Sequence, residues 1–362
     1  MPVIARLPLD VQTLYAELIE QLTALDAQRA LGSLKGTFVT KEVKGRRYAY
    51  LQYSAAGAKK QAYLGPYDAT IQRIEERYRR EHAELLGERT QAQRLCSMLR
   101  QGGAVVADAP SARVLEALAD SGVFRVGGML VGTHAFAVLG SLLGVRWAQA
   151  ALRTHDIDLA AGATSLALAV PTEADADVPG ALERLQMGFF PVPPFNPKDP
   201  STSFRIRGSL LRVDLLTTAA GRAGSSPVFL PRWNAAAMPL RYLDYLLEEP
   251  VRGAVIDGGG VLVNVPTPAR FALHKLLTAA RRDASQAVKA QKDLSQAAQV
   301  LRVLAADRPG DLGLAWEALA ARAGAAKRAR AGAVRLRALD PEGYDALGGR
   351  LAFLGSAGSD PA

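Results

Sequence analysis

Two aspartates in an otherwise apolar stretch constrain the fold of this chain more than any other feature. The stretch reads RTHDIDLAA, with Asp156 and Asp158 separated by Ile157. In a β-strand, residues two apart point to the same face, so the pair would project together while Ile157 enters a core. Carboxylates so close repel each other unless a proton or cation lies between them. A hard divalent cation such as Mg²⁺ would remove that repulsion. The plain alternative is a solvent-exposed strand end, where aspartates are common.

The flanking segments favour the cation site. Upstream, GGMLVGTHAFAVLG predicts an apolar strand that ends at Gly132, followed by a helix that Thr133 caps and that runs to about Leu143. A glycine at such a turn lets a phosphate approach the backbone, and the helix N-terminus offers free N–H groups. Downstream, LLRVDLLT predicts a strand that carries Asp214 and could pair with the first. Three carboxylates beside a phosphate-binding turn predict a two-metal phosphoryl-transfer site.

These motifs resemble the nucleotidyltransferase superfamily of DNA polymerase β. The matching pieces are VGT (Val131, Gly132 and Thr133), DID (Asp156 and Asp158) and VDLL (Asp214). Thr133 replaces the usual Ser or Gly, and the gap before Asp156, which contains GVRW, is longer than in many relatives. The resemblance implies an α+β fold: a polymerase β-like mixed sheet flanked by helices, with an N-terminal helix and β-hairpin module and a C-terminal helical region. It also implies catalytic, metal-ligating roles for the three aspartates and β- and γ-phosphate contacts for Gly132 and Thr133.

The C-terminal helices are similar to those of the AbiE-type toxin nucleotidyltransferases. The segments PARFALHKLLTAARR and KAQKDLSQAAQVL place Lys275 and Asp293 at the matching nucleotide-binding positions. Two structural alternatives stay open. Lys275 could extend its amine from an apolar helix face, and Asp293 could only pair with Lys289 or Lys292 along its own helix. We expect His134 and His274, in apolar helices, to be core histidines.

The charge of the chain favours polyanionic partners. The net charge is +9 and the sequence pI is about 9.7, which suits nucleic acid or nucleotides. Cys96 is the only cysteine, so an internal disulfide and a cysteine zinc cluster are excluded, which is typical of a reducing cytoplasm. No apolar run long enough for a membrane span and no secretory pattern appears in the sequence. We therefore expect a cytoplasmic protein without a membrane partner.

Basic and aromatic residues alternate in the N-terminal region. Strands are predicted there, with turns at VKGR and AAGAKK. The predicted nucleic-acid-binding residues are Lys44, Arg46, Arg47, Lys59 and Lys60, interleaved with Tyr48, Tyr50, Tyr53 and Tyr63. This mixture suits phosphate contact and base stacking. The alternative is an ordinary small sheet with packed tyrosines and lysine-rich edges.

The pattern of elements predicts four regions. Residues 1–105 form a basic module with a helix, a small sheet and a long charged helix. Residues 106–265 form the nucleotidyltransferase core, with strands that include TSLALAVP and a glycine hairpin at GAVIDGGGVLVNVP. Residues 266–340 are helical from a start at Thr267 and Pro268. Residues 341–362, rich in Gly, Ser and Ala, are predicted to be a flexible tail.

The sequence therefore predicts an enzyme that uses Mg²⁺, with Mn²⁺ as an alternative, to move a nucleoside monophosphate from an NTP to a hydroxyl acceptor. RNA is the expected acceptor, by analogy the 3′ end of tRNA. Modification of a protein side chain is the enzymatic alternative. A non-catalytic nucleic-acid-binding or regulatory protein on a transferase scaffold is the other. The preferred nucleotide, an antitoxin partner and the oligomeric state are left open.

Overall fold

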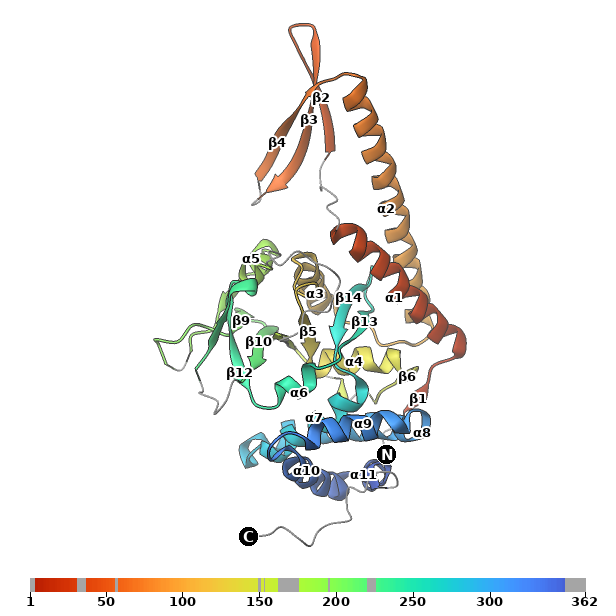
Figure 1. Ribbon diagram of the computed structural model, residues 1–362, viewed down its shortest axis with the longest axis vertical. Coiled ribbons are helices and arrows are strands. Elements are labelled where there is room, and N and C mark those ends of the chain that lie inside the picture. The colour runs from red at the N-terminus through yellow and green to blue at the C-terminus, as the bar shows by residue number, and fades with distance from the viewer. Residues whose placement is uncertain are drawn as a thin grey trace.

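The structure is a computed structural model of the chain. It describes residues 4–30, 37–55, 58–148, 151–152, 154–161, 176–194, 196–219 and 226–348. The molecule has a mixed α/β core in the middle, a helical layer at one end and a small sheet that projects at the other (Figure 1). Among the helices within these ranges, none is long and apolar enough to cross a membrane.

A mixed sheet of seven strands forms the centre of the core. Its main path runs in the order β11 (Val228–Leu230), β12 (Ala235–Leu240), β10 (Arg212–Thr218), β7 (Asp156–Ala161) and β5 (Gly128–Val131). Strands β7, β10 and β12 are parallel, whereas β5 and β11 run antiparallel to their neighbours. Two further strands, β8 (Phe189–Pro191) and β9 (Ser203–Ile206), extend the sheet because β9 pairs antiparallel with the first half of β10. The predicted pairing of the two aspartate-bearing strands is thus confirmed.

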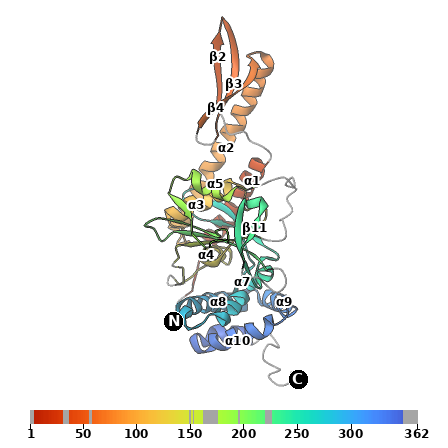
Figure 2. The same ribbon diagram turned by 90° about the vertical axis from the view of Figure 1, so that its left-hand side faces the viewer.

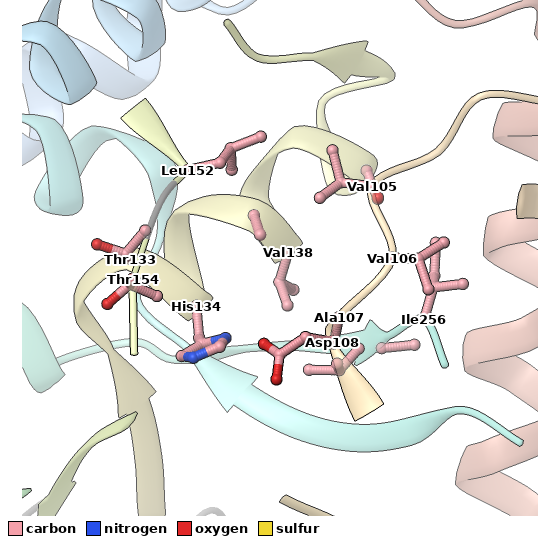
Figure 3. Close-up of a pocket in the computed structure, with 14 residues that line it drawn as sticks. Val105, Val106, Ala107, Asp108, Thr133, His134, Val138, Leu152, Thr154 and Ile256 are labelled. Carbon is pink, nitrogen blue, oxygen red and sulfur yellow. The ribbon is translucent and has the colours of Figure 1, made fainter. Parts of the chain in front are cut away.

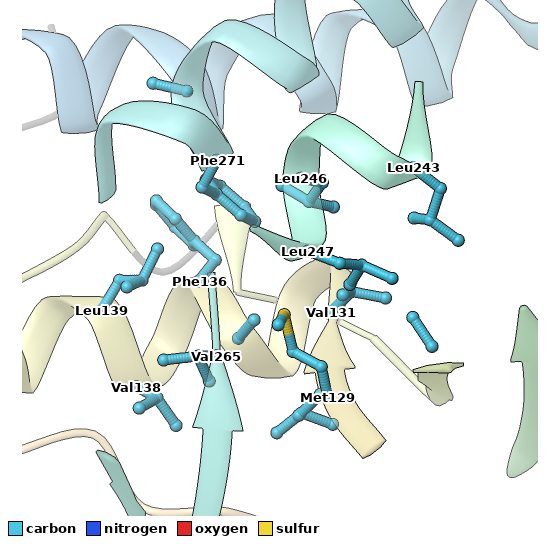
Figure 4. Packing of buried hydrophobic residues seen from close by; sticks show 14 of the residues in the cluster. Met129, Val131, Phe136, Val138, Leu139, Leu243, Leu246, Leu247, Val265 and Phe271 are labelled. Carbon is cyan, nitrogen blue, oxygen red and sulfur yellow. The ribbon is translucent and has the colours of Figure 1, made fainter. Parts of the chain in front are cut away.

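Short helices and a hairpin enclose this sheet. The helices are α3 (Ala109–Asp120), α4 (Gly132–Leu142), α5 (Val178–Arg184) and α6 (Leu243–Leu247), and the hairpin consists of β13 (Val251–Val255) and β14 (Val261–Val265). Buried side chains from α4, α6, β5 and β14 meet those of α7 in one apolar cluster (Figure 4). In its centre the ring of Phe136 stacks on Trp147 at 4.7 Å and on Phe271 at 5.9 Å. This packing fixes the start of α4, where the predicted phosphate turn lies.

Five helices complete the C-terminal part: α7 (Pro268–Arg281), α8 (Ala287–Asp307), α9 (Pro309–Ala320), α10 (Ala325–Leu339) and α11 (Pro341–Gly348). The predicted start of α7 is confirmed, with Thr267 at the N-cap and Pro268 in the first turn, although the Thr267 side chain makes no capping hydrogen bond. Helix α11 covers the first eight residues of the segment predicted as a tail and buries Leu347. Residues 349–362 lie outside the described ranges.

The first helix packs against the core. Helix α1 (Leu9–Ala30) and the C-terminal half of α2 (Ala69–Gln101) share a small apolar core with the β13–β14 hairpin. Within it, the Tyr15 hydroxyl donates a hydrogen bond to the Ala254 carbonyl at 2.8 Å and accepts one from the Ala254 N–H at 2.9 Å. Cys96 is buried in this cluster, and its burial raises the thiol pKa to about 11. Strand β1 (Ala5–Arg6) adds a short pairing with β6 (Val145–Arg146).

The remaining N-terminal strands form a separate three-stranded antiparallel sheet, which we call the arm sheet. It consists of β2 (Thr37–Val43), β3 (Arg46–Ala55) and β4 (Ala58–Pro66). Together with the first half of α2 it projects beyond the core in both views (Figures 1 and 2). The predicted turn at VKGR is confirmed, since Lys44 and Gly45 both adopt positive φ. Residues 56–57 of the AAGAKK turn and the predicted strand TSLALAVP lie outside the described residues.

One local expectation around the phosphate turn was wrong. Helix α4 begins at Gly132, so Thr133 lies inside its first turn, and Val131 is the N-cap residue without a side-chain cap. The Thr133 hydroxyl instead accepts a hydrogen bond from Gln296 Nε2 at 3.3 Å. The GVRW stretch of the long gap before Asp156 contributes to the apolar core. Val145 and Trp147 are buried, and the Trp147 indole N–H donates to the Phe136 carbonyl at 2.6 Å.

Candidate active site

Strand register brings the predicted aspartates together. Asp158 of β7 is the direct partner of Asp214 on β10, and Asp156 is paired in the same way with Arg212. Ile157, between the two aspartates, is fully buried. The expectation that Asp156 and Asp158 project from one face of a strand is therefore confirmed, and Asp214 lies beside them on the neighbouring strand.

Gly132 faces the same carboxylates from the other side of β7. Val131 is the register partner of Asp158 across the antiparallel β5–β7 pair, and Gly132 follows it with a φ of +66°. A Cβ atom at this position would collide with the Asp158 carboxylate. Only glycine combines this left-handed backbone with so close an approach. The turn thus holds the first backbone N–H groups of α4 next to Asp158.

Asp158 is the most strongly perturbed carboxylate of the site. Burial, followed by repulsion from Asp214, raises the pKa of Asp158 to about 7, although Lys275 acts in the opposite direction. Among the described residues, none donates a hydrogen bond to its carboxylate, whereas Asp156 is exposed at the start of the strand. Carboxyl groups are therefore concentrated at the first half of β7 and β10, and Asp158 holds its proton up to about pH 7.

Asp214 is held by two residues that the sequence reasoning missed. Arg212 Nε donates to Asp214 Oδ1 at 2.7 Å, and Ser203 donates to the same oxygen from β9. Arg212 also donates to the Ser203 hydroxyl at 2.9 Å. The position of Arg212, two residues before Asp214 on one strand, was a usable signal. Ser203 carried none, because only the β9–β10 pairing brings it to the site.

A cationic cluster from α7 and α8 faces the aspartates. Asp293 accepts hydrogen bonds from Lys275 Nζ and from Arg282 Nε, each at 2.7 Å. Burial alone would raise the pKa of Asp293, but these two cations outweigh it and hold the pKa below its ordinary value. The alternative pairing along α8 is therefore wrong. Lys275 is largely buried, with its amine 5.2 Å from the Phe271 ring centre.

Lys292 is a further basic residue that the sequence reasoning did not place in the site. Burial, followed by the neighbouring Lys275, lowers the pKa of Lys292, while Asp293, Asp156 and Asp158 oppose this shift. Lys292 therefore lies within electrostatic reach of both the aspartates and the Lys275–Asp293 pair. Its sequence position next to Asp293 was its only signal.

Most of these groups line one cavity of about 350 Å³, but Asp156 and Lys292 are not part of its lining. It lies between the central sheet and the C-terminal helices, and this volume is in the range of small-molecule sites. Its polar lining includes Asp158, Ser203, Arg212, Asp214, His274, Lys275, Arg282 and Asp293, and its apolar lining includes Val131, Met238, Leu240, Leu246 and Phe271. Gly132 also lines it, whereas Thr133 does not. A cavity with carboxylates on one wall and cations on the opposite wall suits a metal-bound polyphosphate.

A second cavity of about 120 Å³ begins at the same turn of α4. Thr133, His134, Thr154 and Asp108 contribute its polar lining (Figure 3). His134 is buried, as expected for a core histidine, but its Nε2 has no hydrogen-bond partner among the described residues. Burial lowers the pKa of His134 to about 4, so its ring is neutral at pH 7.

His274 differs from its expected place. It was predicted to be a core histidine, yet it lines the main cavity beside Lys275. Burial, followed by the charge of Lys275, lowers its pKa to about 4 as well. His274 therefore faces the cavity as a neutral ring at pH 7.

The donor chemistry of the aspartates fits a hard divalent cation. Asp158 and Asp214 lie directly opposite each other, Asp214 raises the pKa of Asp158, and carboxylate oxygens are the preferred ligands of Mg²⁺. Within the described part of the chain, no three His, Cys, Asp or Glu side chains are already close enough to hold a metal.

The predicted nucleic-acid-binding residues lie apart from this site. Lys44, Arg46, Arg47 and Lys59 are exposed on the arm sheet, and the Lys60 side chain lies outside the described residues. Arg47 stacks on Tyr67, 4.4 Å from its ring centre. Their predicted role concerns the arm sheet rather than the chemistry of the aspartates.

Aspartates of two parallel strands that face a glycine turn on a mixed sheet define a phosphoryl-transfer enzyme of the α+β class. A family model described as nucleotidyltransferase matches residues 109–321, more than half of the 362-residue chain. The protein belongs to this nucleotidyltransferase family, and it is therefore a transferase of nucleoside monophosphates. The matched range begins with α3 and ends after α9, so it includes every residue of the cavity described above. No curated protein and no solved structure matches the chain.

Proposed function

We propose that this enzyme uses Mg²⁺ to transfer a nucleoside monophosphate from an NTP to a hydroxyl group of RNA. The observation that carries the proposal is the direct pairing of Asp158 with Asp214, opposite the Gly132 turn and within one cavity. In this proposal Asp156, Asp158 and Asp214 hold the metal. When bound, Mg²⁺ supplies charge stabilisation to the attacking and leaving oxygens.

The chain's own residues have separable tasks in this reaction. The N–H groups at the start of α4, exposed by Gly132, bind the β- and γ-phosphates, as the predicted role of Gly132 and Thr133 requires. Lys275 binds the triphosphate from the opposite wall, and Asp293 holds its amine in place. Because Asp293 also binds Arg282, it positions two cations with one buried carboxylate.

The transfer step balances without another reactant. The acceptor hydroxyl oxygen forms a bond to the α-phosphorus, and the bond from that phosphorus to the bridging oxygen breaks, so pyrophosphate leaves. The proton of the hydroxyl passes to Asp214, which lies at the edge of the cavity nearest Ser203. Arg212 must then release Asp214 Oδ1, and its guanidinium becomes available for a phosphate oxygen.

The test is an incubation of the protein with each of the four α-labelled NTPs, Mg²⁺ and either total RNA or total protein. We expect label on RNA with at least one NTP and none when Mg²⁺ is chelated. If label appears only on protein, the acceptor is a protein side chain and not RNA. No transfer to either acceptor, with Mg²⁺ or Mn²⁺, would contradict the proposed reaction.

A further inference from the structure

The arm sheet has two faces of different character, and within the described residues one is more deeply buried than the other. Ala49 and Leu51 of β3 are buried on the first face, and α2 contacts the sheet at β4. On the other face, cross-strand register places Tyr50 opposite both Val39 and Tyr63, and Tyr48 opposite Lys41. We call this second face the tyrosine face. Its members are Thr37, Val39, Lys41, Val43, Arg46, Tyr48, Tyr50, Gln52, Lys59, Gln61 and Tyr63.

Three tyrosine rings form a continuous surface on this face. The Tyr63 ring centre lies 5.4 Å from that of Tyr50 and 6.2 Å from that of Tyr48. The rings are tilted by 56° and 49°, so they do not close on each other as a stacked core pair would. Tyr63 is 57% exposed, which is unusual for a large ring that serves only packing.

Charge on the tyrosine face has one sign. Lys41, Arg46 and Lys59 belong to it, and none of its described side chains is a carboxylate. Lys41 Nζ lies 5.0 Å from the Tyr50 ring centre and donates to Gln61 at 2.5 Å, which holds the cation against the aromatic surface. Glu42, by contrast, alternates to the first face. The cations of the tyrosine face favour a negatively charged partner. Its exposed rings favour a partner that also carries planar aromatic groups.

We infer that the tyrosine face binds unpaired nucleotides of the RNA substrate, with bases stacked on Tyr48, Tyr50 and Tyr63 and phosphates held by Lys41, Arg46 and Lys59. This inference rests on the proposed function, because it names the form of that substrate as single-stranded. A duplex hides the π-faces of its bases inside the helix, so it can offer this surface only phosphates. The arm projects from the core with α2 and so extends the substrate-binding surface beyond the cavity (Figures 1 and 2).

The test is the affinity of the full-length protein for a labelled single-stranded RNA of roughly a dozen nucleotides, measured by fluorescence anisotropy with the matching duplex beside it. Tyr63→Ala is expected to weaken single-strand binding roughly fivefold or more. Tyr63→Phe keeps the ring and should stay within about twofold of the wild type. The matched control is Phe229→Ala on β11, whose side chain is also 57% exposed, and it should bind like the wild type.

A charge series tests the second half of the inference. Lys41→Gln should weaken binding and lower the salt dependence by about one counterion, whereas Lys327→Gln, an equal charge change at an exposed position of α10, should do neither. Equal affinity for duplex and single strand, or unchanged binding by Tyr63→Ala, would overturn the inference. So would equal competition by poly-glutamate, since the face would then be a general anion surface that also accepts acidic proteins.

The outcome separates this inference from the proposed reaction. Tyrosine-dependent binding of single strands without any nucleotidyl transfer would support the tyrosine face and contradict the proposed function. If the wild type transfers nucleotides to RNA but Tyr63→Ala binds RNA normally, the proposed function would be supported and the role of the tyrosine face contradicted.

Discussion

Asp158 and Asp214 are direct register partners on the parallel strands β7 and β10. Nothing in the sequence spacing of the two residues requires this alignment, because the chain between them includes α5, β8 and β9. The alignment places two carboxylates side by side on the sheet, and Gly132 lies against the Asp158 carboxylate.

Replacement of Gly132 by alanine should damage both stability and activity. The left-handed φ costs an alanine roughly 1 kcal/mol, and its Cβ collides with the Asp158 carboxylate. We expect a lower free energy of unfolding and a loss of transfer of at least about tenfold. Gly258→Ala is the control, because a Cβ at Gly258 meets no atom within 4 Å. Normal transfer by Gly132→Ala would show that the approach to Asp158 does not matter.

Removal of the Asp293 carboxylate should destabilise the protein and weaken NTP binding. The carboxylate is only 5% exposed and binds Lys275 and Arg282, so Asp293→Asn leaves two cations without their partner. We expect a loss of about 3 kcal/mol in the free energy of unfolding, measured by urea denaturation, and a higher KM for NTP. Asp311→Asn, the same change at an exposed site on α9, should alter neither quantity. A stability equal to that of the wild type would contradict a structural role for the pair.

The neutral histidines should make stability fall in mild acid. The folded-state pKa values of His134 and His274 are about 4, well below the ordinary value. Because the unfolded chain takes up protons first, their contribution is complete above about pH 6.5 and is lost as the pH falls towards 4. When the pH falls from 7 to 5, we expect each histidine to lower the free energy of unfolding by roughly 1 to 2 kcal/mol.

The histidine effect is measured as the difference between wild type and His134→Leu or His274→Leu in urea unfolding at both pH values. The comparison with variants matters because Asp158 acts in the opposite sense. Its raised pKa of about 7 gives stability that is present in acid and lost as the pH rises through 7. Parallel pH dependence of wild type and variants would show that the histidines do not titrate as expected.

Much of the fold could be predicted from periodicity. The alternation around Ile157 predicted β7 and the alternation around Asp214 predicted β10, and the first helix expected in the N-terminal module corresponds to α1. Local patterns succeeded here because each element buries its own apolar face. The nucleotidyltransferase fold followed from the order of these motifs.

The supporting contacts of the site could not be predicted in the same way. Ser203 reaches Asp214 only through the β9–β10 pairing, and Lys275 reaches Asp293 only through the packing of α7 on α8. Thr133 was expected to cap α4, but the N-cap is Val131, two residues earlier, and Gln296 binds the Thr133 hydroxyl. Each of these contacts joins residues of different secondary-structure elements, and composition or spacing carries no information on how those elements pack.

Mg²⁺ should stabilise the wild-type protein against heat. A cation that binds between the aspartates relieves the repulsion at Asp158 and binds only the folded state. At pH 7.5 we expect saturating Mg²⁺ to raise Tm by roughly 2 °C or more, and to have no such effect on Asp158→Asn. An equal rise in both proteins would place the stabilising metal elsewhere.

The most direct test of the central claim is the rate of nucleotidyl transfer by Asp158→Asn, with Asp311→Asn as the matched control. Asparagine keeps the shape of the side chain and removes the charge that pairs with Asp214 across the strands. We predict a loss of at least about a hundredfold in a variant that unfolds at or above the wild-type Tm, with the control fully active. Wild-type transfer by Asp158→Asn would contradict the assignment of this site.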